Sequence, residues 1–555
     1  MSGNGATQRR VLRLDPRDNV LVALTNLAKG ECVGAAAEAC ELRSDVPAKQ
    51  KFLTQDVVTG GDIIMYGLLV GKATENLRRG DLLTTRNIRH AAANYHEQDR
   101  TYAWTAPDVS RWRNRTFLGY HRADGQVGTR NHWLVLPLVF CENRNLNVLK
   151  QAFEEELGFA APQIYRRQVA ELARLYREQN AAALQDHTPS GAQLPPPAPK
   201  LFANVDGIKF LLHEGGCGAT REDAKNLCLL LADYIHHPNV AGATVLSLGC
   251  QHSQIQMLQE AIQQRDPHFR KPLLLFEQQK SPSEQAMLSK AIHETFLGLV
   301  EANELTRAPA PLAHLSVGLK CGGSDGFSGL SANPAIGHLA DILAVVGGKG
   351  VLAEFPELCG VEQELINRCV SKDVSNRFIQ LMSDYAARAK AVHASFEMNP
   401  SPGNIRDGLL TDAMKSAGAA KKGGTSPVTG VLDYADYASA SGLNLLCTPG
   451  SDVECVTGQV GAGANIVLFT TGLGTPTGNP IAPVVKISTN STLAARMADI
   501  IDIDAGPIIS GDATIEEMGE AILDRVLQYA SGQAKTKAES LAQDDFIPWK
   551  RGVSL

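Results

Sequence analysis

The chain has 555 residues, too many for one compact core, so we expect two or three domains. Its 44% hydrophobic and 20% charged residues are typical of globular proteins. The net charge is −6, and no run of basic residues alternates with aromatic ones, so we expect no nucleic-acid partner.

Neither a membrane span nor a secretory leader is indicated by the sequence. The longest uncharged apolar stretch, Trp133–Cys141, is far too short to cross a bilayer. Residues 1–18 lack the apolar core of a signal peptide. We therefore predict a cytoplasmic protein without a membrane partner.

The eleven cysteines do not form a recognisable structural pattern. A reducing compartment disfavours a disulfide framework. The chain has no CxxC motif and no cysteine and histidine pairs at zinc-finger spacing, so a structural zinc site is not indicated.

In chain order, the first predicted unit is a small β-rich domain over residues 10–88, where short apolar runs are separated by glycine turns. Residues 89–116 are polar and aperiodic, which predicts a linker. From about residue 130, continuous apolar runs alternate with helical patterns, which is typical of a mostly parallel sheet covered on both faces. The predicted strands are 132–140, 205–212, 241–249, 271–277, 312–319, 347–355, 443–447, 464–472 and 482–489.

Polar or sulfur-containing residues follow many of these strands. In open parallel sheets, ligands bind beyond the carboxyl ends of the strands, so we expect the functional site among these residues. The segments concerned are Cys141–Asn143, His213–Gly218, Cys250–His252, Cys321–Asp325, Glu354 and Leu473–Gly478.

Cys217, Cys250 and Cys321 are candidate metal ligands because thiolates suit iron and iron–sulfur centres. A cluster held by three cysteines would leave one iron open to substrate. Two alternatives remain open from the residues alone. The three thiols are small side chains at strand ends, or Cys217 acts as a nucleophile beside His213.

Two lysines receive different interpretations. Lys486 falls inside an apolar strand, where lysine is normally excluded. It is interpreted either as an exposed residue of an edge strand or as the partner of a substrate carboxylate. Lys415 is interpreted as a solvated helix lysine.

The glycine-rich loops favour a polyhydroxylated acid over a nucleotide. The GxG at Gly461–Gly463 precedes a strand instead of joining a strand to a helix, and no GxxxxGK[ST] occurs. The loops offer hydroxyl and amide groups but no basic cluster for a phosphate. The predicted substrate-binding residues are Ser324, Asn333, Thr475, Thr477 and Asn490.

Several motifs, in the same order along the chain, resemble those of the altronate and galactarate dehydratases. They are GYHRADGQVGTRN (119–131), LGCQ (248–251), CGGSDGFSGLSANP (321–334), NPSPGN (399–404), FTTGLGTPTG (469–478) and DIDAG (502–506). LNLLCTPGSD (443–452) and the final PWKRGVSL look closer to altronate dehydratases.

The resemblance implies an α/β protein with a small N-terminal β-clip domain of SAF type and Rossmann-like, mostly parallel α/β domains. We therefore predict a SAF-like domain at 10–88, a linker at 89–116, a middle α/β domain at 117–305 and a C-terminal Rossmann-like catalytic domain at 306–540. It also implies a cofactor, namely iron (Fe²⁺ or an iron–sulfur cluster) or another divalent metal such as Mn²⁺. A homodimer is the expected assembly.

The implied activity is a hydro-lyase that dehydrates a sugar acid, first an altronate-like aldonate, to a 2-keto-3-deoxy acid. Removal of the proton next to the carboxylate needs electrostatic stabilisation, which a metal supplies. The candidate catalytic residues are His213 and Lys486 as base, and Glu354 and Asp325 as acid or metal ligand.

The sequence departs from the family pattern at four places, and these bear on the expected activity. The family's GHK is KQK at Lys49–Lys51, its HxHN is TTRN at Thr84–Asn87, and its EKS is Met414–Ser416. HEGGCG at His213–Gly218 stands where altronate dehydratases resemble HTYGC. The alternatives are accordingly a galactarate-type aldarate dehydratase, or an inactive homologue that only binds sugar acids.

Overall fold

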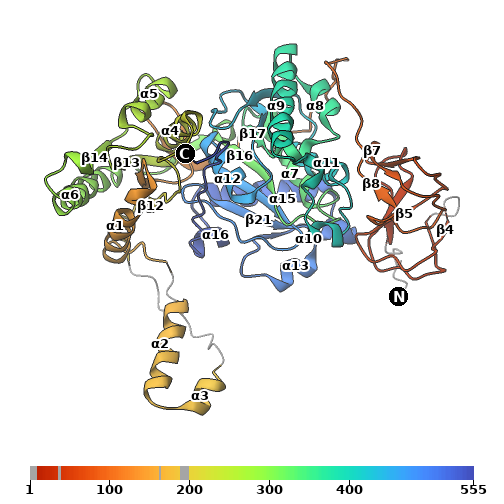
Figure 1. Cartoon of the computed structure of the whole chain (residues 1–555), viewed down its shortest axis with the longest axis horizontal. Helices are drawn as coiled ribbons and strands as arrows, with labels where there is room; N and C mark the ends of the chain where they lie inside the picture. Colours follow the sequence, from red (N-terminus) through yellow and green to blue (C-terminus); the bar gives the residue numbers. More distant parts are fainter. Residues whose placement is uncertain (1–8, 35–38, 100, 162–163, 188–198, 555) are drawn as a thin grey trace.

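The computed structural model describes residues 9–34, 39–99, 101–161, 164–187 and 199–554. It divides into an N-terminal β domain and two parallel-sheet domains, and the C-terminal domain lies between the other two (Figure 1). The predicted fold class, a small β domain followed by mostly parallel α/β domains, is confirmed.

The N-terminal domain consists of short antiparallel strands. Its sheets have the orders β1-β2-β5, β3-β4 and β6-β7-β8. The strands are β1 (Val11–Leu12), β2 (Val20–Ala23), β3 (Cys32–Val33), β4 (Cys40–Glu41), β5 (Lys51–Leu53), β6 (Asp62–Met65), β7 (Leu68–Ala73) and β8 (Ile88–Arg89).

The strands of this domain are short because turns interrupt them. Gly30, Gly60 and Gly80 have φ of +79°, +81° and +86°, a left-handed conformation that glycine adopts without steric cost. The core of the domain includes Val20 and Val22 and continues into Phe327 and Met414 of the C-terminal domain. The N-terminal domain is therefore packed against the C-terminal domain.

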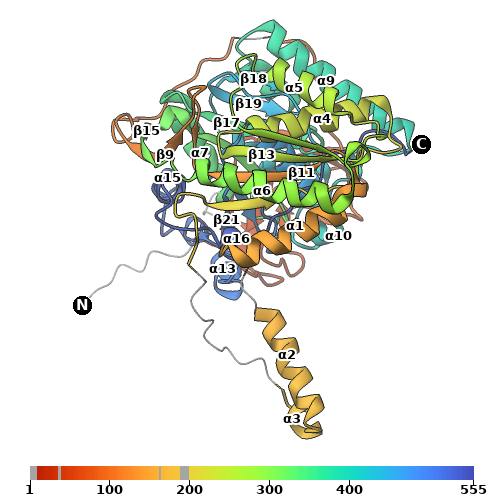
Figure 2. The same ribbon diagram turned by 90° about the vertical axis from the view of Figure 1, so that its left-hand side faces the viewer.

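The middle domain contains a four-stranded parallel sheet in the order β12-β11-β13-β14. Helices α4 and α5 cover one face of this sheet, and α1 and α6 cover the other (Figure 2). The strands are β11 (His132–Pro137), β12 (Gly207–Phe210), β13 (Val240–Ser247) and β14 (Leu273–Glu277), and the helices are α1 (Asn143–Glu156), α4 (Arg221–His236), α5 (Ile255–Arg265) and α6 (Glu284–Ala302).

Two further features belong to this part of the chain. Strands β9 (Thr116–His121), β10 (Val127–Gly128) and β15 (Ala308–Pro311) form a small antiparallel sheet. Helices α2 (Ile164–Arg177) and α3 (Ala181–Gln185) project away from the rest of the chain (Figure 1).

The C-terminal domain contains a seven-stranded parallel sheet in the order β18-β19-β17-β16-β20-β21-β22. The strands are β16 (Ser316–Cys321), β17 (Lys349–Leu352), β18 (Val428–Leu432), β19 (Gly442–Leu446), β20 (Ile466–Thr471), β21 (Val484–Ser488) and β22 (Ile503–Asp504). The helices are α7 (Ala332–Val345), α8 (Glu362–Arg368), α9 (Lys372–Ala391), α10 (Pro402–Arg406), α11 (Asp412–Ala419), α12 (Asp452–Gly461), α13 (Ser491–Arg496), α14 (Pro507–Ser510), α15 (Ile515–Ala530) and α16 (Lys537–Ser540).

The two α/β domains share one hydrophobic core, in which Leu230 and Tyr234 of α4 lie with Val456 and Val460 of α12. After α16 the chain returns to the middle domain, where the Arg551 N–H donates to the Asp223 carboxylate at 2.8 Å.

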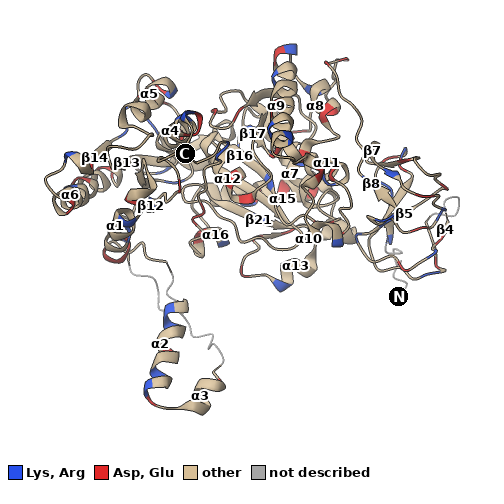
Figure 3. Ribbon diagram, in the orientation of Figure 1, with Lys and Arg blue, Asp and Glu red and all other residues tan. Residues whose placement is uncertain are grey.

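Charged residues of both signs are interspersed along the chain (Figure 3). Among the described residues, no helix has the length and hydropathy needed to cross a bilayer.

Candidate active site

The loops that follow strands β16 and β20 lie against each other at the carboxyl edge of the C-terminal sheet. The Gly322 N–H donates to the Thr470 carbonyl and the Gly472 N–H to the Gly323 carbonyl, both at 3.0 Å. Gly323 has φ +57°, and a Cβ on it would lie 2.9 Å from Thr475 Oγ1. The glycines after β16 therefore allow two strand-end loops to approach closely.

A buried cluster of charged side chains begins at the end of β16. The ammonium of Lys320 donates to Glu354 and forms an ion pair with Asp452 at 2.9 Å. Lys422 Nζ lies 2.7 Å from a Glu354 oxygen and 2.8 Å from the sulfur of Cys321. Lys320 and Glu354 are fully buried, and Lys422 is 1% exposed.

The cluster continues to Glu357 and Lys415. Lys415 Nζ lies 2.8 Å from Glu357 Oε1 and donates to Asn399 Oδ1 at 2.6 Å. The thiol of Cys321 donates to the other Glu357 oxygen at 3.4 Å. The interpretation of Lys415 as a solvated residue is wrong, because all eight residues of α11 are buried and Lys415 is only 8% exposed.

Three ammonium groups and three carboxylates balance in this cluster, with Cys321 present as a thiol. Burial, which outweighs the nearby Lys422, raises the pKa of Cys321 to about 11. Burial alone would lower the pKa of Lys422, but Cys321 and Glu354 raise it above its ordinary value. Burial opposes ionisation of Glu357, yet Lys415 and Lys422 hold its pKa below the usual range.

Glu354 adopts an unusual backbone conformation. Its φ of +71° and ψ of +62° are left-handed, a region that residues other than glycine rarely occupy and that costs about 1–3 kcal/mol. This conformation, at the start of the short 3₁₀ segment Phe355–Leu358, places the carboxylate between Lys320 and Lys422. Backbone strain of this kind is concentrated at functional sites.

A divalent metal does not fit among these side chains. The ligand atoms of Cys321, Glu354 and Glu357 do lie within 4.8 Å of one another. However, the ammonium groups of Lys422 and Lys415 already bind the same sulfur and oxygens. A divalent cation there would be repelled by the adjacent ammonium groups. Cys321 is therefore a hydrogen-bonded thiol in this cluster.

Asp325 organises a second polar group beside the cluster. Its carboxylate is fully buried and accepts hydrogen bonds from the Ser328 and Thr489 hydroxyls, both at 3.0 Å. Asn490 Nδ2 lies 3.4 Å from the same carboxylate. Asp325 thus shares the carboxyl edge of the sheet with Cys321, although its oxygens already have partners.

The predicted substrate-binding residues differ in whether other residues of the chain already use their hydrogen-bonding groups. The side chain of Asn333 is fully used, because Nδ2 donates to the Gly418 carbonyl and Oδ1 accepts from the Thr470 hydroxyl. Ser324 is buried, and its carbonyl accepts from Asn404. Thr475 lies beside Gly323 and is partly exposed, whereas Thr477 is buried.

His213 and Lys486 lie outside the cluster. His213 Nε2 donates to the Pro137 carbonyl at 2.8 Å, and Nδ1 accepts from the Gly215 N–H at 3.1 Å. Burial lowers the pKa of His213 to about 4, so this ring is neutral and supports a loop. Lys486 donates to Gln543 Oε1 at 2.5 Å. Neither contact supports the predicted base role.

The three predicted metal ligands are divided between two sheets. Cys321 ends β16 of the C-terminal sheet, whereas Cys217 and Cys250 follow β12 and β13 of the middle sheet. Both of the latter are exposed. Among the described residues, these three sulfurs are not a set whose ligand atoms all lie within 4.8 Å of one another, and their grouping in one centre stays a prediction.

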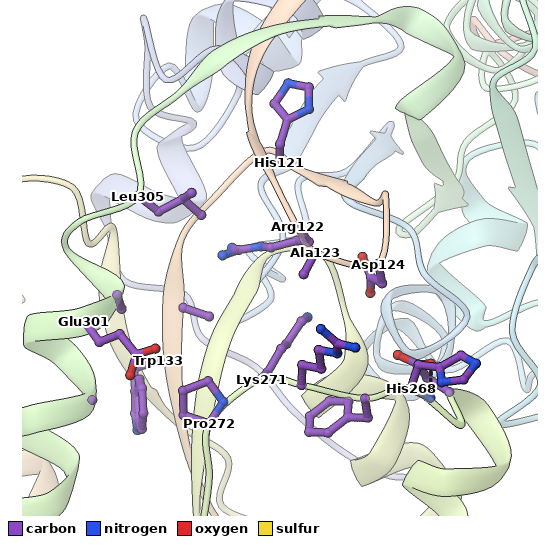
Figure 4. Close-up of a pocket in the computed structure, with 16 residues that line it drawn as sticks. His121, Arg122, Ala123, Asp124, Trp133, His268, Lys271, Pro272, Glu301 and Leu305 are labelled. Atoms are coloured by element: carbon purple, nitrogen blue, oxygen red, sulfur yellow. Dashed lines mark hydrogen bonds between the residues drawn. The ribbon is translucent and has the colours of Figure 1, made fainter.

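A cavity of about 650 Å³ lies at the opposite, amino-terminal edge of the middle sheet (Figure 4). Arg122, Lys271, Asp124 and Glu301 line it, so both signs of charge are present. The cavity contains none of the predicted site residues.

Comparison with known proteins gives full-length matches. Three family models match: altronate/galactarate dehydratase SAF domain at residues 9–91, D-galactarate dehydratase/altronate hydrolase second domain at 119–303, and D-galactarate/altronate dehydratase C-terminal at 312–554. The altronate dehydratases of Bacillus subtilis (strain 168) and Escherichia coli (strain K12) are 32% and 33% identical, each over 98% of this chain and 99% of the relative. The galactarate dehydratase (L-threo-forming) of Escherichia coli (strain K12) is 30% identical over 89% of this chain and 88% of its own.

The chain belongs to the D-galactarate/altronate dehydratase family. As a member of a family of dehydratases, it is a hydro-lyase. The predicted family is thereby confirmed.

The SAF domain contributes a lysine to the edge of the candidate site. Lys49 Nζ lies 3.0 Å from Asp325 Oδ2 and 2.8 Å from Asp407 Oδ1. Its φ of +75° is left-handed, at the position where the family pattern has the glycine of GHK. Lys51 donates to the Gly408 carbonyl at 2.6 Å, and burial lowers its pKa to about 7.

Sequence reasoning missed Lys320 and Lys422. Lys320, like Lys486, is a lysine within an apolar strand, and it directly precedes Cys321. The same sequence pattern could therefore have identified it. Lys422 follows α11 in AKKGG, which resembles a solvated turn, and nothing local indicates its burial.

Proposed function

We propose that the protein dehydrates an altronate-like aldonate to a 2-keto-3-deoxy acid and that the buried Lys320–Glu354–Lys422 cluster performs this reaction. The observation that carries the proposal is Glu354, a strained, fully buried carboxylate held between two ammonium groups at the carboxyl edge of the sheet.

The reaction needs a base for the proton at C2 and positive charge for the enediolate that forms. Glu354 is the base in this proposal, and Lys422 stabilises the charge that develops on the substrate carboxylate. Lys415, which forms an ion pair with the neighbouring Glu357, is the proton donor for the leaving hydroxyl. General acid–base groups of this kind contribute roughly 10²–10⁴-fold each.

Burial strengthens these electrostatic effects. The low dielectric of a closed site makes each charge interaction larger than it is in water. Because Lys320, Glu354, Lys415 and Lys422 are at most 8% exposed, substrate reaches them only when a surrounding loop moves. The glycine-rich segments 322–326 and 472–474 border the cluster and contain left-handed glycines.

Iron remains the proposed cofactor, with Mn²⁺ as the other divalent candidate. A bound metal supplies Lewis acidity to a carboxylate or a leaving hydroxyl. The cluster around Cys321 does not hold it, for the reason given above.

The relatives support an altronate-like substrate as the first candidate. Both altronate dehydratases match over 99% of their length, whereas the galactarate dehydratase matches over 88% at slightly lower identity. A galactarate-type aldarate is therefore the second candidate. Hydroxyl and amide groups such as Thr475 and Asn490 border the site, which favours a hydroxylated substrate.

The test is a screen of the purified protein with altronate, other aldonates, galactarate, a 6-phosphoaldonate, lactate and malate, with 2-keto acid as the detected product. We expect turnover of an aldonate and none of the phosphorylated or short acids, because sites that bind hydroxyls reject analogues lacking them by about 10⁴–10⁵-fold. Best turnover of galactarate would select the second candidate. Binding without any product would show an inactive homologue.

A further inference from the structure

Three exposed cysteines occupy the carboxyl edge of the middle sheet. Cys141 follows β11, Cys217 follows β12 and Cys250 follows β13, and these three strands are neighbours in the order β12-β11-β13. Hydrogen bonds join their loops. The Phe140 N–H donates to the Gly215 carbonyl at 3.1 Å, and the His252 N–H donates to the Gly216 carbonyl at 2.9 Å.

The glycines directly before Cys217 and Cys250 have no room for a side chain. Gly216, directly before Cys217, has φ +95°, and a Cβ on it would lie 2.1 Å from the Leu138 carbonyl oxygen. Gly249, directly before Cys250, has φ +125°, and a Cβ on it would lie 2.6 Å from Gln279 Oε1. Two cysteines are thus presented by glycine turns that permit close contact between the loops.

The three sulfurs are electrostatic neighbours. The thiols of Cys217 and Cys250 both lie near enough to the thiol of Cys141 to interact with it electrostatically. The amide of Gln279 donates to the sulfur of Cys250 at 3.2 Å. Such N–H donors to sulfur tune iron–sulfur centres.

The spacing distinguishes between kinds of metal centre. Within the described part of the chain, these sulfurs are not among the ligand sets whose atoms all lie within 4.8 Å of one another. One ion with metal–sulfur bonds of about 2.3 Å needs its sulfurs within about 4.6 Å. A cluster binds each thiolate through a different iron and so tolerates a wider spacing.

We propose that Cys141, Cys217 and Cys250 hold an iron–sulfur cluster. Soft thiolates select such clusters, and each thiol releases its proton when it binds iron. Three thiolates leave one iron of a four-iron cluster without a protein ligand. Cys217 lines a cavity of about 580 Å³, which gives iron and sulfide access to the site. Cys141 thus replaces Cys321 in the set that the sequence predicted.

The test measures metal content without turnover, so it is independent of the proposed function. The full chain is purified without oxygen, supplied with iron and sulfide, and desalted. We expect about four iron and four acid-labile sulfide per chain with a broad visible absorption. Cys141→Ser, Cys217→Ser and Cys250→Ser should each lower retained iron and sulfide by about tenfold or more.

Two control variants make the result specific. Cys321→Ser removes a thiol from the other sheet, and Cys32→Ser removes an exposed thiol of the N-terminal domain. Both should retain iron and sulfide at the level of the unmodified chain. Circular dichroism of every variant confirms folding.

The proposal is overturned if the unmodified chain binds iron without sulfide, binds zinc in its place, or retains neither. It is also overturned if the three variants keep their sulfide, or if folded Cys321→Ser loses it. A disulfide between two of these cysteines in the anaerobic protein would have the same consequence.

Discussion

Replacing Glu354 by glutamine tests the buried cluster with a minimal change in shape. The substitution removes one negative charge from between Lys320 and Lys422, which leaves two buried ammonium groups without their shared partner. Removal of one partner from a buried pair costs about 3–5 kcal/mol. For a domain of about 240 residues, each kcal/mol lowers the melting temperature by about 2–4 °C, so a decrease of roughly 6–20 °C is expected.

The same substitution removes the proposed base. At a temperature where the variant remains folded, we expect kcat to fall by about 10²–10⁴-fold. The matched control is Glu362→Gln. Glu362 is also a buried carboxylate, but burial raises its pKa to about 7, and its described contact is the Gly360 N–H. This control should change both quantities far less.

The result that refutes this reasoning is a folded Glu354→Gln protein with unchanged kcat. A melting temperature equal to that of the unmodified chain would further show that the two ammonium groups do not depend on this carboxylate. Both measurements use the full-length chain, by scanning calorimetry and by 2-keto acid formation.

Three further predictions concern other parts of the chain. Burial, followed by Glu357, raises the pKa of Asp412 to about 8, so the folded chain keeps a proton that the unfolded chain loses above about pH 4. This contribution to stability is complete at low pH and declines as pH rises toward 8. Asp412→Asn should therefore have a higher melting temperature than the unmodified chain at pH 9. Equal melting temperatures at pH 9 would contradict this prediction. Lys49→Met and Lys49→Gly both leave Asp325 without this cation, but only the glycine variant relieves the strain of the left-handed φ. The free energy of unfolding of Lys49→Gly should therefore exceed that of Lys49→Met by about 1 kcal/mol in urea unfolding. A more stable methionine variant would count against the strain. Lys486→Met should keep kcat within about threefold because the lysine contacts Gln543, and a loss of more than 10²-fold would restore it to the site.

The fold was largely predictable because its signals are local. Continuous apolar runs such as Ile466–Thr471 and Val484–Ser488 are long, buried on both sides and separated by helices, which is the pattern of a parallel sheet. The small sheet of β9, β10 and β15 was not predictable, because its strands come from positions nearly two hundred residues apart.

The site was predictable only in part. Cys321, Asp325 and Glu354 could be placed at one edge of the sheet from the sequence because each lies at or just after the end of a strand and the carboxyl ends of parallel strands meet. Lys422 was missed because its burial depends on where α11 ends relative to β17, which no local pattern records. The grouping of Cys217 with Cys321 is not supported, because strand ends of two different sheets look alike in the sequence.

The most direct test of the central claim is the position of an aldonate bound to the Glu354→Gln variant, determined by crystallography. The account predicts the substrate carboxylate within hydrogen-bond distance of Lys422, with C2 facing residue 354. An aldonate bound instead in the cavity lined by Arg122 and Lys271, with the Lys320–Glu354–Lys422 cluster closed, would contradict it.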